Sequence, residues 1–135
     1  MTPEPNRGSA AGRGGSQPPR LSVVVPCHNE AGNLERLVEE IRLALEPGGP
    51  DYEVVLVDDA STDGTWELLR RLGAGDARVR GLRLAAQGGQ SAAMWAGLEH
   101  ARGEVLVTLD ADLQNPPSEI PRLVAELEGW DCVCG

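Results

Sequence analysis

Residues 105–117 read VLVTLDADLQNPP, and this segment sets the main expectation for the fold. An apolar run leads into two carboxylates, Asp110 and Asp112, and a carboxamide follows at Gln114. A buried strand with this ending places negative charge at the carboxyl edge of a sheet, where open α/β folds bind ligands. Magnesium typically uses one or two carboxylates together with substrate phosphates. The same residues could equally cap a helix or fill a turn, so the rest of the sequence must decide.

The size and charge of the chain narrow the possible functions. Its 135 residues are typical of one domain that can bury a core. A net charge of −9, from 21 acidic and 12 basic residues, argues against a nucleic-acid-binding protein, which needs a basic surface. A phosphorylated ligand remains possible, because a bound cation can supply the missing positive charge.

The cysteines and the apolar runs bear on where the protein acts. Cys27, Cys132 and Cys134 are odd in number and lack Cys-x-x-Cys spacing, so we expect reduced, buried thiols. The sequence contains no apolar run long enough to cross a membrane and no secretory signal. We therefore expect a cytoplasmic protein. Residues 1–20 are rich in Gly, Pro and Ser and are expected to be a disordered leader.

Apolar runs alternate with helical periodicity along the rest of the chain. Buried strands are predicted at Leu21–Pro26, Tyr52–Val57, Val79–Leu84, Glu104–Leu109 and Trp130–Cys134. The intervening helices are predicted to start after an Asn29 N-cap, to span Trp66–Leu72 and Ser91–Ala101, and to begin at Pro116 and Pro117. This alternation predicts an α/β fold, with a mostly parallel open sheet and helices on both faces.

Three polar segments follow predicted strands: residues 26–30, 58–59 and 110–114. Right-handed crossovers put the carboxyl ends of parallel strands on one edge of the sheet. The three segments are far apart in sequence, and chance alone would rarely bring all three to one edge. Their convergence therefore favours a ligand site over separate caps and turns.

The residue types in these segments exclude two classes of nucleotide-binding protein. A dinucleotide-binding fold needs a glycine-rich first turn, and Pro26–Glu30 contains no glycine. A phosphorylation receiver module needs a late lysine, and the sequence contains no lysine. A cation on Asp110, Asp112 and Gln114 could instead neutralise a diphosphate and stabilise it as a leaving group. This chemistry suits transfer of a sugar from a nucleotide sugar.

Four motifs in this order resemble those of glycosyltransferase family 2, which has the GT-A fold. The motifs are LSVVVPCHNE at 21–30, VDDASTDGT at 57–65, GQSAA at 89–93 followed by Ala96 and Gly97, and LDADLQNPP at 109–117. The resemblance runs almost continuously from Leu21 to Gly135. The Asp-x-Asp-x-Gln motif followed by proline is similar to the polyprenyl-phosphate sugar transferases of the family, which act on dolichol phosphate or undecaprenyl phosphate.

The resemblance implies a role for each matching residue. Pro26, His28 and Glu30 would hold the nucleotide, and Val57 and Asp59 would contact its base and ribose. The metal and diphosphate site is implied at Asp110, Ala111, Asp112 and Gln114. Mg²⁺ or Mn²⁺ would bind Asp110, Asp112 and Gln114, with Asp112 as the catalytic carboxylate.

The implied reaction is inverting transfer of a hexose from a GDP- or UDP-linked sugar to a polyprenyl phosphate at the cytoplasmic face of the membrane. The acceptor phosphate is already an anion, so it has less need of a general base than a hydroxyl group. Positioning and charge stabilisation would then supply most of the rate.

The sequence also departs from the family pattern. Gln87 and Gly88 stand where members often have Asn and a basic residue, which implies a lost contact near the phosphates. Family members continue beyond the position of Gly135 into an acceptor-binding half, and many carry membrane helices. The segment 21–135 is therefore expected to be a truncated nucleotide-sugar-binding domain that would need the missing half or a membrane-embedded partner. Two alternatives stay open: a binding module without turnover, and a structural α/β domain with incidental acids.

Overall fold

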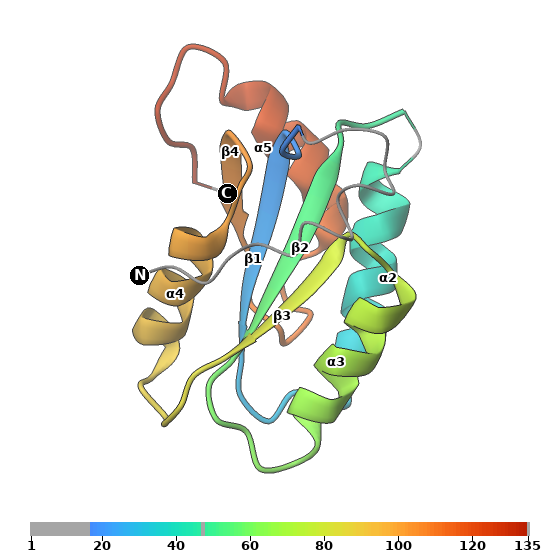
Figure 1. The fold of residues 1–135 in the computed structure, drawn as a ribbon. Coiled ribbons are helices and arrows are strands. Elements are labelled where there is room, and N and C mark those ends of the chain that lie inside the picture. Colours follow the sequence, from blue (N-terminus) through green and yellow to red (C-terminus); the bar gives the residue numbers. More distant parts are fainter. Residues whose placement is uncertain (1–16, 47, 135) are drawn as a thin grey trace.

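The structure is a computed structural model that describes residues 17–46 and 48–134 (Figure 1). Its elements are β1 (Leu21–Cys27), α2 (Leu34–Leu45), β2 (Tyr52–Asp58), α3 (Thr65–Gly75), β3 (Val79–Arg83), α4 (Gln90–His100), β4 (Val105–Thr108), the 3-10 turn η1 (Pro117–Glu119) and α5 (Ile120–Glu126). The four strands form a parallel sheet in the order β3-β2-β1-β4. The predicted α/β class with a parallel sheet is confirmed.

β1 is the strand on which the sheet is aligned. It pairs with β2 from Leu21↔Tyr52 to Cys27↔Asp58, and with β4 from Leu21↔Val105 to Val24↔Thr108. Every residue of β1 and β2 is buried. These strands lie in the centre of the sheet with helices over both faces, which explains why their sequences are continuous apolar runs instead of alternating ones.

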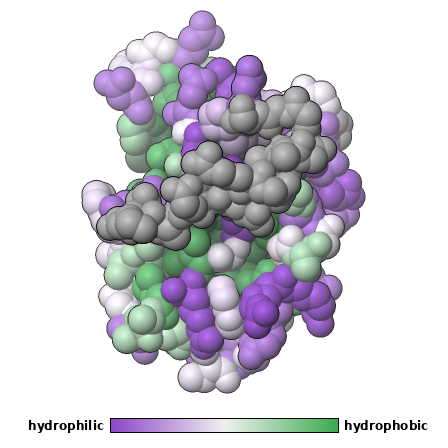
Figure 2. Space-filling view, in the orientation of Figure 1, coloured by the Kyte–Doolittle hydropathy of each residue, from purple (hydrophilic) through white to green (hydrophobic). Residues whose placement is uncertain are grey.

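The helices are divided unequally between the two faces, as Figure 1 shows. On one face, α2, α3 and α5 cover a large core that includes Leu37, Ile41, Leu56, Leu69 and Ile120. On the other face, α4 is the one helix among the described residues, and it packs over a small core formed by Val24, Val55, Val57 and Ala93. Hydrophobic residues gather on the side of the molecule where α4 and β4 lie (Figure 2). Helices therefore cover both faces, as predicted.

The small residues of α4 allow it to lie directly on the sheet. Gly97 is buried, and a Cβ atom added to it would overlap Val24 Cγ1 and lie 3.0 Å from Val57 Cγ2. The absence of a side chain at Gly97 therefore allows α4 to approach the sheet closely.

Gly97→Ala is expected to lower the free energy of unfolding by about 1–3 kcal/mol, because the added methyl group must displace packed valines. Urea unfolding measures the change. The matched control is Gly75→Ala at the end of α3, where an added Cβ meets no atom within 4 Å. The control should be neutral or slightly stabilising. Equal stability of the two variants would contradict the close approach of α4.

A buried ion-pair network ties the amino-terminal edge of the sheet together. Glu53 is 1% exposed and accepts hydrogen bonds from Ser22 Oγ at 2.6 Å and from Arg102 N at 2.7 Å. It also pairs with Arg80 Nε at 3.0 Å and with Arg102 NH2 at 3.2 Å. Burial alone would raise the pKa of Glu53, but these hydrogen bonds and charges outweigh it and hold the pKa below the ordinary 4.5. The network joins β1, β2, β3 and the segment that leads into β4.

Glu53→Ala is expected to lower the free energy of unfolding by about 3–5 kcal/mol at neutral pH, because two arginines lose their buried partner. The folded pKa of Glu53 lies below the unfolded one, so its contribution is complete above the unfolded pKa and is lost as the pH falls through the folded pKa. The difference between wild type and variant should therefore shrink in strong acid. Urea unfolding across a pH series measures it.

The control for this experiment is Glu104→Ala, since the Glu104 side chain is 76% exposed and lies 4.0 Å from Arg20. Its loss should change stability by no more than about 0.5 kcal/mol at any pH. A Glu53 variant that behaves like this control would contradict a stabilising network.

Several predicted boundaries are wrong. The segment 130–134 forms no strand within the described residues, and Trp130 is 72% exposed. A strand needs a paired neighbour for its backbone groups, and this segment lies along the groove between β4 and α5 without pairing. Cys132 and Cys134 are consequently exposed, contrary to prediction, whereas Cys27 is buried as predicted.

The predicted start of the first helix is also wrong. Asn29 does not cap α2, which begins at Leu34 after Asn33. Asn29 instead adopts a left-handed backbone conformation with φ 53°, and its side-chain oxygen accepts a hydrogen bond from Thr62 N at 2.9 Å. A contact between two loops has replaced the local cap.

Two further expectations concern the flanks of the domain. Residues 1–16 of the predicted leader lie outside the described part of the chain. Just before β1, the backbone N–H of Arg20 donates a hydrogen bond to the carbonyl oxygen of Asp51 at 3.0 Å. Among the helices of the described residues, none has the length and apolar character needed to cross a bilayer.

Candidate functional site

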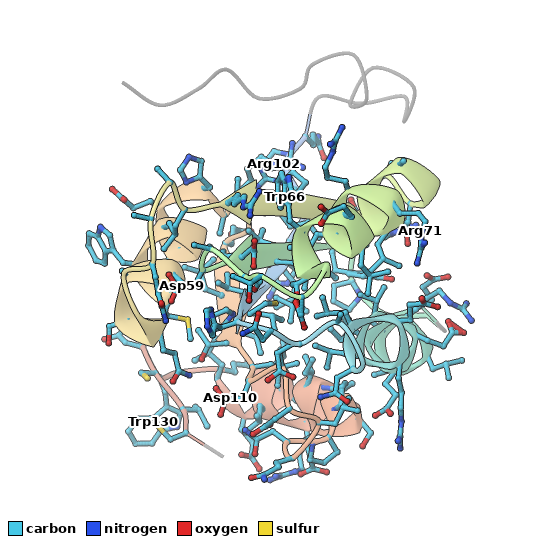
Figure 3. The ribbon with its side chains drawn as sticks, turned by 90° about the horizontal axis from the view of Figure 1, so that it is seen from below. Asp59, Trp66, Arg71, Arg102, Asp110 and Trp130 are labelled. Atoms are coloured by element: carbon cyan, nitrogen blue, oxygen red, sulfur yellow. The ribbon has the colours of Figure 1, made fainter. Side chains whose placement is uncertain are left out.

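A pocket of about 240 Å³ lies at the carboxyl ends of the strands. The residues that line it are Pro26, Cys27, His28, Glu30, Asp59, Gln90, Ala93, Asp110, Ala111 and Asp112. They come from the ends of β1 and β2, the start of α4 and the segment after β4. Figure 3 looks onto this edge and shows Asp59 beside α4 and Asp110 near the chain that leads to α5. The three polar segments thus converge as predicted.

The residues after β1 are held by the loop after β2. The backbone N–H of Asn29 donates to Ser61 Oγ at 2.9 Å, and that of Glu30 donates to Thr65 Oγ1 at 3.1 Å. The imidazole Nδ1 of His28 lies 2.8 Å from the carbonyl oxygen of Asp59. A carbonyl oxygen can only accept, so Nδ1 carries the proton and Nε2 is an acceptor, which lies 3.5 Å from the carboxamide Nδ2 of Asn29.

Asp58 and Asp59 are adjacent in sequence, but their side chains have different partners. Asp58 is fully buried, accepts from Ser61 N at 3.2 Å and lies 3.3 Å from Arg83 Nε. Asp59 points into the pocket, and its two oxygens accept from Gly88 N at 2.7 Å and Gly89 N at 2.9 Å. The sequence predicts Asp59 as a base or ribose contact but does not predict the hydrogen bonds that Asp59 accepts from the turn before α4. These hydrogen bonds depend on tertiary structure, and no local sequence pattern indicates them.

The carboxylates after β4 sit at the opposite side of the pocket. Asp110 Oδ1 accepts a hydrogen bond from Gln90 Nε2 at 2.9 Å. Asp112 is exposed and accepts from Gln114 N at 3.1 Å, which bends the chain just before the prolines. Gln90 lies in the GQSAA motif, but the sequence analysis assigned no role to this pocket residue.

Two predicted site residues lie away from the pocket lining. Val57 is fully buried under α4, so its side chain belongs to the small core. Gln114 is exposed, and it is its backbone that contacts Asp112. The remaining predicted site residues all line the pocket: Pro26, His28, Glu30, Asp59, Asp110, Ala111 and Asp112.

The charge of the pocket is strongly negative. Four acids line it, namely Glu30, Asp59, Asp110 and Asp112, whereas none of its described lining residues is an arginine. The sequence also lacks lysine. A diphosphate in this pocket would therefore require a cation between it and the carboxylates.

The donor set fits a hard divalent cation that keeps part of its coordination for a ligand. Residues 17–46 and 48–134 contain no cluster of three or more His, Cys, Asp or Glu side chains arranged to enclose an ion. Asp110 and Asp112 supply carboxylate oxygens on one side of the pocket. Two carboxylates completed by phosphate oxygens match the usual coordination of magnesium.

Cys27 lines the pocket but is chemically inert. Burial, together with the negative charges of Asp58 and Glu30, raises the pKa of its thiol to about 12. The thiol is therefore protonated at neutral pH, and only the thiolate is a good nucleophile or metal ligand. Covalent catalysis at Cys27 is excluded on this ground.

Comparison with known families decides the lineage of the chain. The family described as Glycosyl transferase family 2 matches residues 22–135. The chain belongs to this family. The resemblance stated from the four motifs is thereby confirmed.

Curated relatives within glycosyltransferase family 2 resemble the chain over most of its length. It is 46% identical over 115 residues to the undecaprenyl-phosphate 4-deoxy-4-formamido-L-arabinose transferase of Aeromonas hydrophila. It is 43% identical over 116 residues to the protein of the same name from Salmonella paratyphi B. These matches cover 84% of the chain but only 35% and 36% of the relatives. The chain thus spans about a third of the length of these relatives.

Solved structures of other proteins share the fold. The mannosyltransferase PcManGT from Pyrobaculum calidifontis, solved with GDP-Man and Mn²⁺, is 33% identical with a TM-score of 0.69, over 83% of this chain and 33% of its own. TarS from S. aureus in complex with UDP is 26% identical with a TM-score of 0.65, over 82% of this chain and 32% of its own. The GT-A fold expected from the motifs is confirmed.

In this family 2 chain, Asp59→Asn tests the hydrogen bonds that Gly88 and Gly89 donate to the Asp59 carboxylate. Asparagine has one acceptor oxygen, so either Gly88 or Gly89 loses its hydrogen bond. A bond to a charged group contributes about 1.5–3 kcal/mol, so amide hydrogen exchange at that glycine should be roughly 10- to 100-fold faster. Exchange followed by NMR measures this effect. Asp63→Asn, an exposed change in the loop after β2, is the control and should leave both glycines protected. If both glycine amides stay equally protected in Asp59→Asn, the two hydrogen bonds to Asp59 are contradicted.

Proposed function

We propose that this chain is the donor-binding part of a glycosyltransferase that takes a sugar from a nucleotide sugar, with a divalent cation, and transfers it to a polyprenyl phosphate with inversion. The observation that carries the proposal is one pocket that is lined by Asp59 at one side and by Asp110 and Asp112 at the other. The names of the undecaprenyl-phosphate relatives and the GDP-Man and Mn²⁺ bound to PcManGT support it.

Each predicted site residue that lines the pocket has a role in this proposal. Asp59 would accept N–H groups of a GDP or UDP base, Pro26 and Glu30 would bound the nucleotide, and Nε2 of His28 would accept from its ribose. Asp110 and Asp112 would hold Mg²⁺ or Mn²⁺, with Ala111 between them close to the diphosphate. Gln114 stays a predicted ligand of the cation, which it could reach only after its carboxamide turns towards Asp112.

The reaction requires little proton chemistry from the chain. A phosphate oxygen of the acceptor would attack the anomeric carbon while the bond to the diphosphate breaks, and the nucleoside diphosphate would leave with the electron pair. When bound, the cation would neutralise the charge that develops on this leaving group. The chain's own part would be to orient the donor and to hold the cation through Asp112, its proposed catalytic carboxylate.

The sugar and the acceptor need separate tests. The relatives are named for a derivative of arabinose, a pentose, whereas PcManGT was solved with a hexose donor, GDP-Man. Both classes of donor should therefore be tested beside the hexose that the sequence predicts. A lipid-phosphate acceptor would place the chain at the cytoplasmic face of a membrane, as a peripheral protein.

A second candidate function is a nucleotide-sugar-binding module that needs further polypeptide, or a membrane-embedded partner, for turnover. The chain's coverage of only 35% of the relatives favours it. Nucleoside diphosphate release from donor and undecaprenyl phosphate separates the candidates. Release by this chain alone supports the enzyme, and donor binding without release supports the module.

Asp112→Asn is expected to weaken Mn²⁺-dependent binding of UDP or GDP at least about ten-fold, since a neutral amide holds the cation less strongly than a carboxylate. Calorimetry with Mn²⁺ and with a chelator measures it. Asp131→Asn is the control, because Asp131 is exposed and lies outside the pocket lining. Wild-type binding that does not depend on Mn²⁺, or unchanged binding by Asp112→Asn, would refute the proposed cation site.

A further inference from the structure

The two ends of the pocket are joined by three consecutive residues. Gly88 N and Gly89 N donate to the carboxylate of Asp59, and the next residue, Gln90, donates from Nε2 to Oδ1 of Asp110. Asp59 follows β2 and Asp110 follows β4, with β1 between those strands in the sheet. The turn therefore bridges two carboxylates that the sheet keeps apart.

The geometry of this turn leaves it little freedom to absorb a change at one end. Gly89 has φ 93° and ψ 168°, a conformation that side chains rarely adopt, and it immediately precedes α4. A Cβ atom on Gly88 would lie 2.9 Å from Ala92 Cβ, so the turn is pressed against its own helix. The helix in turn is seated on the sheet at Gly97 and Ala93. Gly88, Gly89 and Gln90 are consecutive, so a change at Gln90 would act on a turn that these contacts confine.

The hydrogen bond of Gln90 conflicts with a cation on the same oxygen of Asp110. The carboxamide directs the positive end of an N–H dipole at Oδ1, and a cation there would repel it. Turning the carboxamide so that its oxygen faces the cation would remove this repulsion. Asp59, meanwhile, has both oxygens engaged by the turn, and a base N–H needs one of their remaining lone pairs.

We propose that Gln90 is a positioning residue that couples cation binding at Asp110 to nucleobase binding at Asp59. A cation displaces the Gln90 carboxamide, the turn relaxes its hold on Asp59, and the carboxylate becomes a better acceptor for the base. Coupling of this kind is reciprocal, so a bound base also favours the cation. The inference rests on the proposed function, which supplies the cation and the nucleotide.

Magnesium alone tests the coupling by NMR, without a nucleotide and without turnover. In the wild-type chain, Mg²⁺ should shift the amide signals of Gly88 and Gly89 together with those of residues 110–112. In Gln90→Ala, the signals of residues 110–112 should still shift, while those of the two glycines should not. Gln90 is exposed at the first position of α4, where alanine is well tolerated, so the variant should fold.

Two further variants sharpen the test. Gln87→Ala removes the same type of side chain from the same turn, but Gln87 is exposed and outside the pocket lining, so this control should respond as wild type does. Gln90→Glu keeps the length of the side chain and has no N–H to donate to Asp110. The glycine response should be lost in Gln90→Glu as well, and its retention there would overturn the proposal.

A binding measurement adds a second readout. The factor by which Mg²⁺ tightens UDP or GDP binding should fall about five-fold or more in Gln90→Ala and stay unchanged in Gln87→Ala. Glycine signals that respond equally in Gln90→Ala and wild type would overturn the coupling while leaving the cation site intact. If Mg²⁺ shifts no signal of residues 110–112 in the wild-type chain, the proposed cation site itself fails, and the coupling falls with it.

Discussion

The parallel pairing of β1 with both β2 and β4 is the constraint on which the site depends. Backbone hydrogen bonds fix Cys27 opposite Asp58 and Val24 opposite Thr108, and the polar residues that follow these strands consequently leave the sheet at one edge. A shift of register by one residue would turn every side chain of a strand to the other face. The complete burial of β1 and β2 makes such a shift costly, so packing of the core also holds the carboxylates in place.

The acidic side chains at the two edges of the sheet differ in the partners that neutralise them. At the amino edge, Glu53 is enclosed by Arg80 and Arg102 and is fully compensated. At the carboxyl edge, Arg83 compensates Asp58, and the carboxylate of Asp59 accepts hydrogen bonds from the backbone amides of Gly88 and Gly89. A buried charge needs partners, whereas an acid that faces a pocket can keep its capacity for a ligand. This asymmetry separates the residues that stabilise the fold from those available for chemistry.

Local sequence patterns were enough to predict the central strands and the converging acids. The apolar runs of β1 and β2 are long and unambiguous, and parallel topology then determines where Asp59, Asp110 and Asp112 lie. Predictions failed where a tertiary contact or a missing partner decided the outcome. Asn29 had the composition of a helix cap but bonds to Thr62, and residues 130–134 had the composition of a strand but pair with none in the described structure.

The hydrogen bonds that join the two sides of the pocket could not be predicted from local sequence patterns either, because they too depend on tertiary contacts. Gln90 lies in the GQSAA motif at 89–93, but the motif assigned it no role, and its significance comes from a hydrogen bond to a residue twenty positions away. The hydrogen bonds from Gly88 and Gly89 to Asp59 likewise join segments about thirty residues apart. Such contacts become visible only when the sheet and α4 are assembled.

The charge of the pocket bears on the order in which a donor and a cation could bind. Four carboxylates without a cationic side chain in the described lining repel a free diphosphate. A divalent cation bound first would neutralise the charges of Asp110 and Asp112 and, in the proposed coupling, would also displace the N–H group of Gln90. Electrostatic attraction and release of the turn would then act in the same direction. In the proposed function, therefore, the acidic lining makes donor binding conditional on the cation, which an arginine in the same place would not do.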